Sequence, residues 1–198
     1  MSLRSHLFFL LLLPFASCTL ALPEFQTAQS LAQGEQRLVA GGFTGYGLNT
    51  STGVAAAHSY GLSDRWDWNT HLGIARLQVE DPNIKYSALT GPKWSTQNGN
   101  FAITAPTGIV YLNYLDALDE GVAYTTTPTV MYSWHPSSRH SLTFWVRNEW
   151  SYNFFYGRWY WAVAGTTYKF PIESRSAYWS ISGTRGGIYT GIGISLFE

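Results

Sequence analysis

The chain has 198 residues, and its 12 basic and 12 acidic side chains give a formal net charge of zero. A nucleic-acid-binding protein needs a basic field, so this balance argues against a nucleic-acid partner. Charged residues make up only 12% of the chain and aromatic residues 17%. The length favours a single domain, and few charges with abundant Trp and Tyr favour an outer surface that faces lipid.

The first 21 residues read as a secretory signal peptide. Arg4 supplies a positive charge, residues 7–13 form a short apolar run, and small residues precede a cleavage site at Ala21. In an alternative interpretation this is a lipoprotein signal, and Cys18, the single cysteine of the chain, carries a lipid. Removal of the signal peptide with Cys18 would leave no thiol. The protein would then need another source of stability, such as a closed strand network.

Residues 22–36 are polar and lack the alternation of a strand. We expect them to form a flexible periplasmic N-terminal segment. After the signal peptide, no apolar run approaches the roughly 20 residues that a transmembrane helix needs. Any crossing of a membrane would therefore use strands.

From residue 37 onward the chain divides into short β-rich runs separated by turn signals. We predict ten strands, with eight as the alternative, at residues 37–47, 53–62, 65–79, 84–96, 101–113, 121–135, 140–153, 159–171, 176–184 and 187–197. Short turns alternate with mostly longer connections, which is typical of a closed antiparallel up-and-down transmembrane β-barrel. Pro106 and Pro128 each remove a hydrogen-bond donor inside a predicted strand, so we expect a bulge or local opening at both.

Several of these strands alternate between an apolar face and a small or polar face. The apolar face carries a predicted outward girdle of aromatic residues, namely Trp66, Trp68, Tyr124, Tyr132, Trp134, Trp150 and Tyr152. Aromatic girdles flank the apolar band of outer-membrane barrels. A soluble barrel of the same topology would instead turn its apolar face inward.

The opposite faces carry ionisable residues that the barrel would gather in its lumen. These are Asp67, His71, Lys93, Arg147, Glu149 and Lys169. Isolated charges are costly in a narrow interior, so we expect acids and bases to pair into a polar network that plugs the lumen. The alternative is a gated path for ions or small solutes lined by the same groups.

The sequence contains no motif that indicates catalysis or a cofactor. It has no Gly-x-Ser-x-Gly, His-Glu-x-x-His, phosphate-binding-loop or dinucleotide-binding pattern. Three acids, Asp116, Asp119 and Glu120, share one predicted outer connection, where a solvated surface explains them better than a divalent-cation site. We therefore predict no catalytic residues, no metal site and no cofactor.

The final strand alternates between apolar and small or polar side chains. Its apolar residues are Ile192, Ile194 and Leu196, and Phe197 follows them. With the signal peptide, the strand alternation and the Trp and Tyr positions, this terminus resembles small bacterial outer-membrane β-barrel proteins over residues 37–198. One departure is Glu198, because such barrels usually end on the aromatic residue itself.

The resemblance implies residence in the outer membrane of a Gram-negative cell envelope, among its lipids and lipopolysaccharide. It also implies recognition of Ile192, Ile194, Leu196 and Phe197 by the barrel assembly machinery during insertion. No catalytic residues carry over. The His-x-Ser-Asn segment of the lipid A deacylases is absent, and the region from Asp116 to Glu120 lacks the nearby His of the omptin proteases.

The leading hypothesis is a non-enzymatic outer-membrane barrel with a structural, adhesive or narrow, porin-like channel role. One alternative is an outer-membrane enzyme that acts on lipid A or phospholipid at the outer rim. Another is a soluble periplasmic barrel that binds an apolar ligand. It requires the following residues to lie inside the barrel: Trp66, Trp68, Tyr124, Val130, Trp134 and Leu196.

Overall fold

The computed structural model describes residues 23–47, 50–78, 82–113, 121–153, 157–184 and 187–197. Its elements are β1 (Gln36–Gly47), β2 (Thr50–Ser63), β3 (Trp66–Gln78), β4 (Pro82–Ser95), β5 (Phe101–Thr104), β6 (Thr107–Asn113), β7 (Gly121–Thr126), β8 (Thr129–Ser137), β9 (His140–Asn153), β10 (Gly157–Ile172), β11 (Arg175–Thr184) and β12 (Gly187–Phe197). Over these ranges, no helix has the length and hydrophobicity needed to cross a bilayer.

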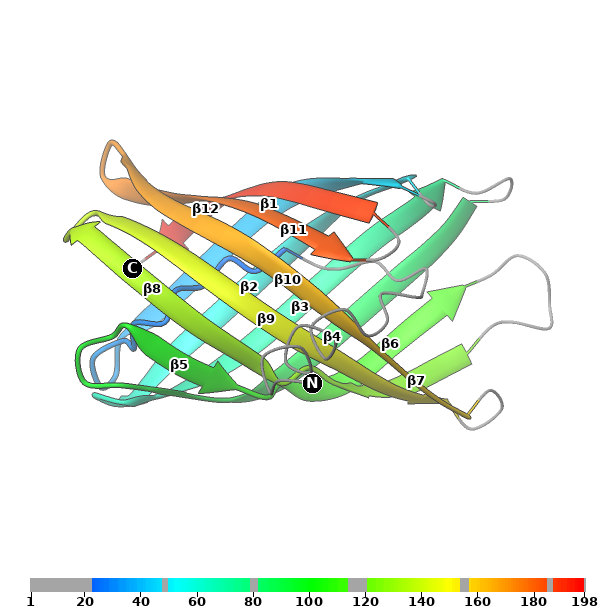
Figure 1. Cartoon of the computed structure of the whole chain (residues 1–198), viewed down its shortest axis with the longest axis horizontal. Coiled ribbons are helices and arrows are strands. Elements are labelled where there is room, and N and C mark those ends of the chain that lie inside the picture. The colour runs from blue at the N-terminus through cyan, green and yellow to red at the C-terminus, as the bar shows by residue number, and fades with distance from the viewer. Residues whose placement is uncertain are drawn as a thin grey trace, which may run out of the picture.

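All the strands belong to one antiparallel sheet that closes on itself (Figure 1). β1 pairs with β2 and with β12, while β10 pairs with both β9 and β11. β5 and β6 follow one another along β4, and β7 and β8 follow one another along β9. Each of these two couples forms one interrupted strand, so the twelve segments make a ten-strand barrel. The predicted all-β, closed antiparallel barrel of ten strands is confirmed.

Both interruptions fall at the expected prolines. Pro106 separates β5 from β6, and Pro128 separates β7 from β8, because proline has no backbone N–H to donate to a ladder. Hydrogen bonds nevertheless bridge both breaks. The Thr127 N–H donates to the Pro106 carbonyl, and the Asn148 N–H donates to the Pro128 carbonyl, each at 2.9 Å. The wall therefore remains continuous at these positions.

The two ends of the barrel differ. At one end β1 begins, β12 ends, and the connections at 64–65, 96–100, 138–139 and 173–174 join neighbouring strands; we call this the turn end. Gly99 and Glu173 adopt left-handed backbone conformations there, with φ of 68° and 52°. At the opposite, loop end the residues that link the strands lie outside the described ranges.

Residues 23–35 enter the barrel from the turn end, and we call them the plug segment. Residues 23–28 and 31 are buried in the interior, whereas residues 32–35 are exposed. In Figure 1 the plug segment is the blue trace seen between the strands. Phe25 is 1% exposed and Ala28 is fully buried, and both belong to an apolar core with Val39, Tyr178 and Tyr189 of the wall. The core of the molecule therefore lies inside the barrel, around the plug segment.

This placement differs from the flexible periplasmic segment that the sequence predicts for residues 22–36. The physical reason is the need to fill a ten-strand interior at the density of a protein core. The inward faces of β1 and β12 carry small residues such as Gly41, Gly191 and Gly193, which leave space beside the wall. The apolar side chains of the plug segment gain burial by occupying that space.

Candidate functional site

Two buried ion pairs join residues of the barrel wall. Lys93 Nζ lies 2.7 Å from Asp67 Oδ2, and these residues stand opposite one another on β4 and β3. Lys85 Nζ lies 3.6 Å from Glu149 Oε1. The second pair reaches from β4 to β9, which β6 and β7 separate in the wall, so it crosses part of the lumen. Pairing offsets much of the free-energy cost of burying these charges.

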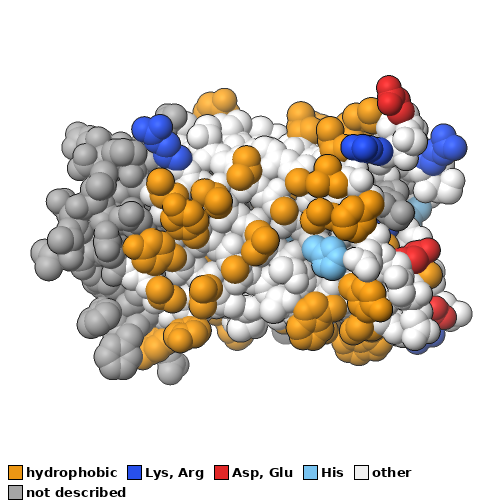
Figure 2. Space-filling view, turned by 180° about the vertical axis from the view of Figure 1, so that it is seen from behind, with side chains coloured by type: hydrophobic (Ala, Val, Ile, Leu, Met, Phe, Trp, Pro, Cys, Tyr) orange, Lys and Arg blue, Asp and Glu red, His pale blue; other side chains and the backbone are white. Residues whose placement is uncertain are grey.

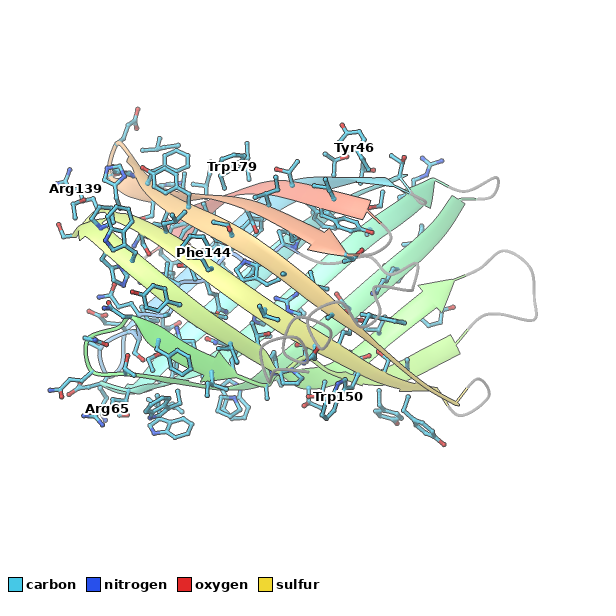
Figure 3. The ribbon with its side chains drawn as sticks, viewed as in Figure 1. Tyr46, Arg65, Arg139, Phe144, Trp150 and Trp179 are labelled. Atoms are coloured by element: carbon cyan, nitrogen blue, oxygen red, sulfur yellow. The ribbon has the colours of Figure 1, made fainter. Side chains whose placement is uncertain are left out.

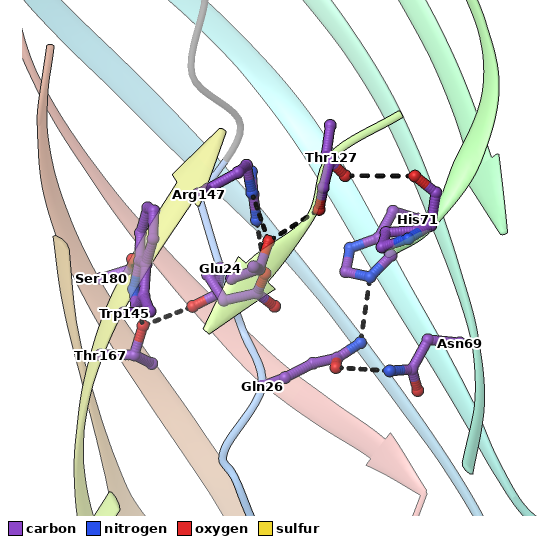
Figure 4. Close-up of polar contacts among 11 residues, drawn as sticks. Glu24, Gln26, Asn69, His71, Thr127, Trp145, Arg147, Thr167 and Ser180 are labelled. Carbon is purple, nitrogen blue, oxygen red and sulfur yellow. Dashed lines mark hydrogen bonds and ion pairs between the residues drawn. The ribbon is translucent and has the colours of Figure 1, made fainter. Parts of the chain in front are cut away.

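A third ion pair joins the wall to the plug segment. Arg147 of β9 pairs with Glu24, whose side chain is 1% exposed (Figure 4). Arg147 Nε also donates to Thr129 Oγ1 at 3.4 Å, and Thr167 Oγ1 donates to the Glu24 backbone carbonyl. Charge-assisted hydrogen bonds are the stronger ones, so Glu24 is the main polar anchor near the inner end of the plug segment.

Gln26 anchors the plug segment to β3 (Figure 4). Asn69 Nδ2 donates to Gln26 Oε1 at 2.9 Å, and Gln26 Nε2 lies 3.2 Å from His71 Nε2. With this amide orientation Gln26 Nε2 is the donor, so His71 Nε2 accepts and the ring is neutral. His71 thus acts here as a hydrogen-bond acceptor for the plug segment.

The Asp67–Lys93 pair also holds the backbone of the plug segment. The Leu31 N–H donates to Asp67 Oδ1 at 3.0 Å, and Lys93 Nζ donates to the Thr27 and Gln29 carbonyls at 3.3 and 2.9 Å. A segment without a strand partner must satisfy its buried backbone groups in another way. The side chains of the wall do this here.

All six residues of the predicted lumen network face the interior: Asp67, His71, Lys93, Arg147, Glu149 and Lys169. They do not form one cluster. Lys169 lies with its Nζ 6.0 Å from the centre of the Tyr178 ring, opposite Tyr178 across the β10–β11 ladder. The sequence analysis did not identify Lys85 and Glu24, the partners of Glu149 and Arg147.

Glycines on the inward face of β12 are the sequence signal that could have revealed the plug segment. A Cβ on Gly193 would lie 3.2 Å from the Phe25 ring, and a Cβ on Gly191 would lie 3.1 Å from Pro23 Cβ. These positions have no side chain of their own to fill the lumen. Their small size indicates that another part of the chain occupies the space.

The outer surface is largely apolar. In Figure 2 hydrophobic side chains are spread over the middle of the barrel, and charged side chains lie toward its ends. The predicted girdle residues are exposed on this surface, and their fractional exposures range from 43% to 68% for Trp66, Trp68, Tyr124, Tyr132, Trp134, Trp150 and Tyr152. Trp66, Trp68, Tyr132 and Trp134 lie toward the turn end, while Tyr124, Trp150 and Tyr152 lie toward the loop end.

Aliphatic side chains such as Val130 and Val146 occupy the surface between these two aromatic bands. Figure 3 shows Tyr46, Trp150 and Trp179 pointing away from the barrel.

The terminal strand contributes to the same apolar surface. Ile192, Ile194, Leu196 and Phe197 are 40–60% exposed. The soluble ligand-binding alternative requires six apolar residues to lie inside the barrel. All six are exposed on its outer surface instead: Trp66, Trp68, Tyr124, Val130, Trp134 and Leu196.

No group of three metal-binding side chains occurs among the described residues. Asp116, Asp119 and Glu120 lie outside those ranges. A comparison with models of protein families and with curated protein sequences finds no match.

Proposed function

We propose that this protein is a non-enzymatic outer-membrane β-barrel of the Gram-negative envelope, with a structural or narrow-channel role and a lumen closed by its own plug segment. The observation that supports this proposal most strongly is the distribution of polar and apolar side chains between the inside and the outside of the barrel. An exposed apolar surface with aromatic side chains toward both ends encloses buried ion pairs. In water such a surface would be unfavourable, whereas lipid requires it and interfacial Trp and Tyr anchor it.

The proposed partners follow from this surface. Membrane lipids would cover the aliphatic band, and Trp and Tyr would lie at the headgroup level on both sides. Arg76 is exposed near the loop end of β3, where a cation suits the phosphates of lipopolysaccharide. The barrel assembly machinery would insert the chain, with Ile192–Phe197 as its terminal strand.

Val130→Arg tests the membrane assignment. Val130 is 46% exposed at mid-height on the barrel wall, and an Arg at the bilayer midplane costs about 2–4 kcal/mol. We expect this variant to fail to assemble in the membrane. The measurement is gel mobility of the membrane-extracted protein with and without boiling, because a folded barrel shifts on heating.

Val122→Arg is the matched control. Val122 is 47% exposed on the same interrupted strand but lies beside the loop end, where an Arg costs about 0–1 kcal/mol. This variant should assemble and show the heat shift. Equal assembly of both variants, with the protein in the soluble periplasmic fraction, would contradict the proposal.

A further inference from the structure

The plug segment is held in a way that lets it leave without opening the barrel. Between residues 23 and 33 the structure shows no strand pairing with the wall. The barrel is closed by the β1–β12 ladder, which joins positions from Leu38 to Gly47 with positions from Phe197 to Gly187. Departure of residues 23–33 would break side-chain contacts and no strand pairing of the wall.

The wall and the plug segment contribute different charges to the interior of the barrel. Of the three buried ion pairs found in the described part of the chain, two are made within the wall, whereas Arg147 pairs with Glu24 of the plug segment. Glu24 is the one charged residue between positions 23 and 33, so departure of these residues would remove a negative charge, and no positive charge, from beside Arg147.

The space that the plug segment occupies runs along the small residues of the wall. Phe25 packs against Gly193, and Pro23 lies against Gly191. Ala55 and Ala57 of β2 are also buried residues with little side-chain volume. Removing the plug segment would therefore leave space along this part of the wall, where the wall has little side-chain volume of its own.

We propose that the plug segment is a displaceable stopper and that its departure opens a narrow path selective for small inorganic anions, with Arg147 as the uncovered binding group. Cationic side chains that line a constriction favour anions over cations. This inference rests on the proposed membrane barrel. The known chemistry of Arg with carboxylates and other oxyanions explains why Glu24 closes the path when it is in place.

A reversible disulfide tests the proposal in the full-length protein. The Ala28 N–H donates to Ser133 Oγ at 2.9 Å, so these residues lie side by side on the plug segment and β8. Ala28→Cys with Ser133→Cys places one thiol on each, and Cys18 is the only other cysteine in the sequence. The purified protein is inserted into a planar bilayer across a KCl gradient, first oxidised and then after reduction.

We expect a silent oxidised protein, and after reduction brief openings whose reversal potential shows chloride to be more permeant than potassium. Two results would overturn the proposal: the same current in both redox states, or openings selective for potassium. The heat shift is measured on the same samples. A barrel that shows the heat shift but never conducts refutes the stopper. A protein without a heat shift after extraction from membranes refutes the proposed membrane barrel, on which the stopper rests.

A second disulfide between the plug segment and the wall, and a control disulfide within the wall, test whether the current depends on the plug segment or on the substitutions themselves. Pro23→Cys with Gly191→Cys tethers the inner end of the plug segment, where a Cβ at position 191 lies 3.1 Å from Pro23 Cβ. This disulfide should abolish the current when oxidised, as the disulfide between positions 28 and 133 does. Thr125→Cys with Ser151→Cys links two wall residues whose hydroxyls lie 2.8 Å apart. This control should conduct equally in both redox states, and a redox-dependent current there would overturn the assignment to the plug segment.

Discussion

At the scale of single residues, the Glu24–Arg147 pair is the contact on which the position of the plug segment depends most. Both side chains are buried, Glu24 at 1% exposure and Arg147 at 8%. Removing one partner from a buried pair costs about 3–5 kcal/mol, because the remaining charge keeps its desolvation penalty. In this protein the plug segment can leave, and water can then solvate Arg147. The cost should therefore appear as release of the segment rather than as unfolding of the barrel.

Glu24→Gln is expected to release the plug segment. A loss of about 3 kcal/mol corresponds to roughly a hundredfold change in the equilibrium between the closed and open forms. Hydrogen exchange of the amides in residues 23–33 should accelerate by a similar factor, while exchange in β1 and β12 stays slow. Mass spectrometry of peptic fragments measures both regions in the same sample.

Glu35→Gln is the control for this substitution. Glu35 lies at the turn end, is exposed, and accepts a hydrogen bond from the Ala32 N–H at 3.0 Å. Exposed interactions of this kind contribute little. Its exchange pattern should match that of the unchanged protein. If both variants accelerate exchange equally, the anchoring role of Glu24 is wrong.

At the scale of elements, the inward face of β12 is shaped to fit the plug segment. A Cβ on Gly193 would lie 2.9 Å from Val39 Cγ1 and 3.2 Å from two atoms of the Phe25 ring. The strand backbone itself accepts a β-branched residue readily. A larger side chain at this position therefore conflicts with the Val39 side chain and the Phe25 ring inside the lumen, and it leaves the strand pairing intact.

Gly193→Val should displace Phe25 and loosen the plug segment while the barrel still forms. We expect faster hydrogen exchange in residues 23–33, with the heat shift of the barrel retained. Gly183→Val is the matched control, because a Cβ there has no neighbour within 4 Å. Unchanged exchange at residues 23–33 in Gly193→Val would show that Phe25 is not held by this strand.

The strands could be predicted from the sequence because alternation with a period of two is a local pattern. The range predicted at 140–153 coincides with β9, and the range at 187–197 coincides with β12. Even the breaks at Pro106 and Pro128 follow from a property of single residues. The pattern needs no knowledge of distant contacts, which is why ten strands could be recognised.

The plug segment could not be predicted in this way. Its contacts join residues far apart in the chain, such as Glu24 with Arg147 and Leu31 with Asp67. It has no periodicity that marks it, and its polar composition resembles that of a solvated tail. Only the charge balance of the closed lumen and the glycines facing it indicate its place, and both depend on the assembled barrel.

At the scale of the whole molecule, the barrel separates two environments with opposite demands. The outer surface carries exposed aliphatic and aromatic side chains, and the interior combines an apolar core around Phe25 with ion pairs and hydroxyl groups at nearly full burial. Over the described residues the strand ladder closes on itself, so the sheet has no free edge. Because the strand ladder closes without the plug segment, the segment can control the interior without breaking a strand pairing of the wall.

The charge of the lumen can be changed at one ion pair in two opposite ways. Lys85→Gln and Glu149→Gln both break the same pair, whose charged atoms lie 3.6 Å apart. If the open path selects anions by the charge of its wall, Lys85→Gln should lower the chloride-to-potassium permeability ratio and Glu149→Gln should raise it. Each variant is made in the Ala28→Cys, Ser133→Cys protein and measured after reduction. A purely structural effect of breaking the pair would shift both ratios in the same direction, and that result would exclude charge as the source of selectivity.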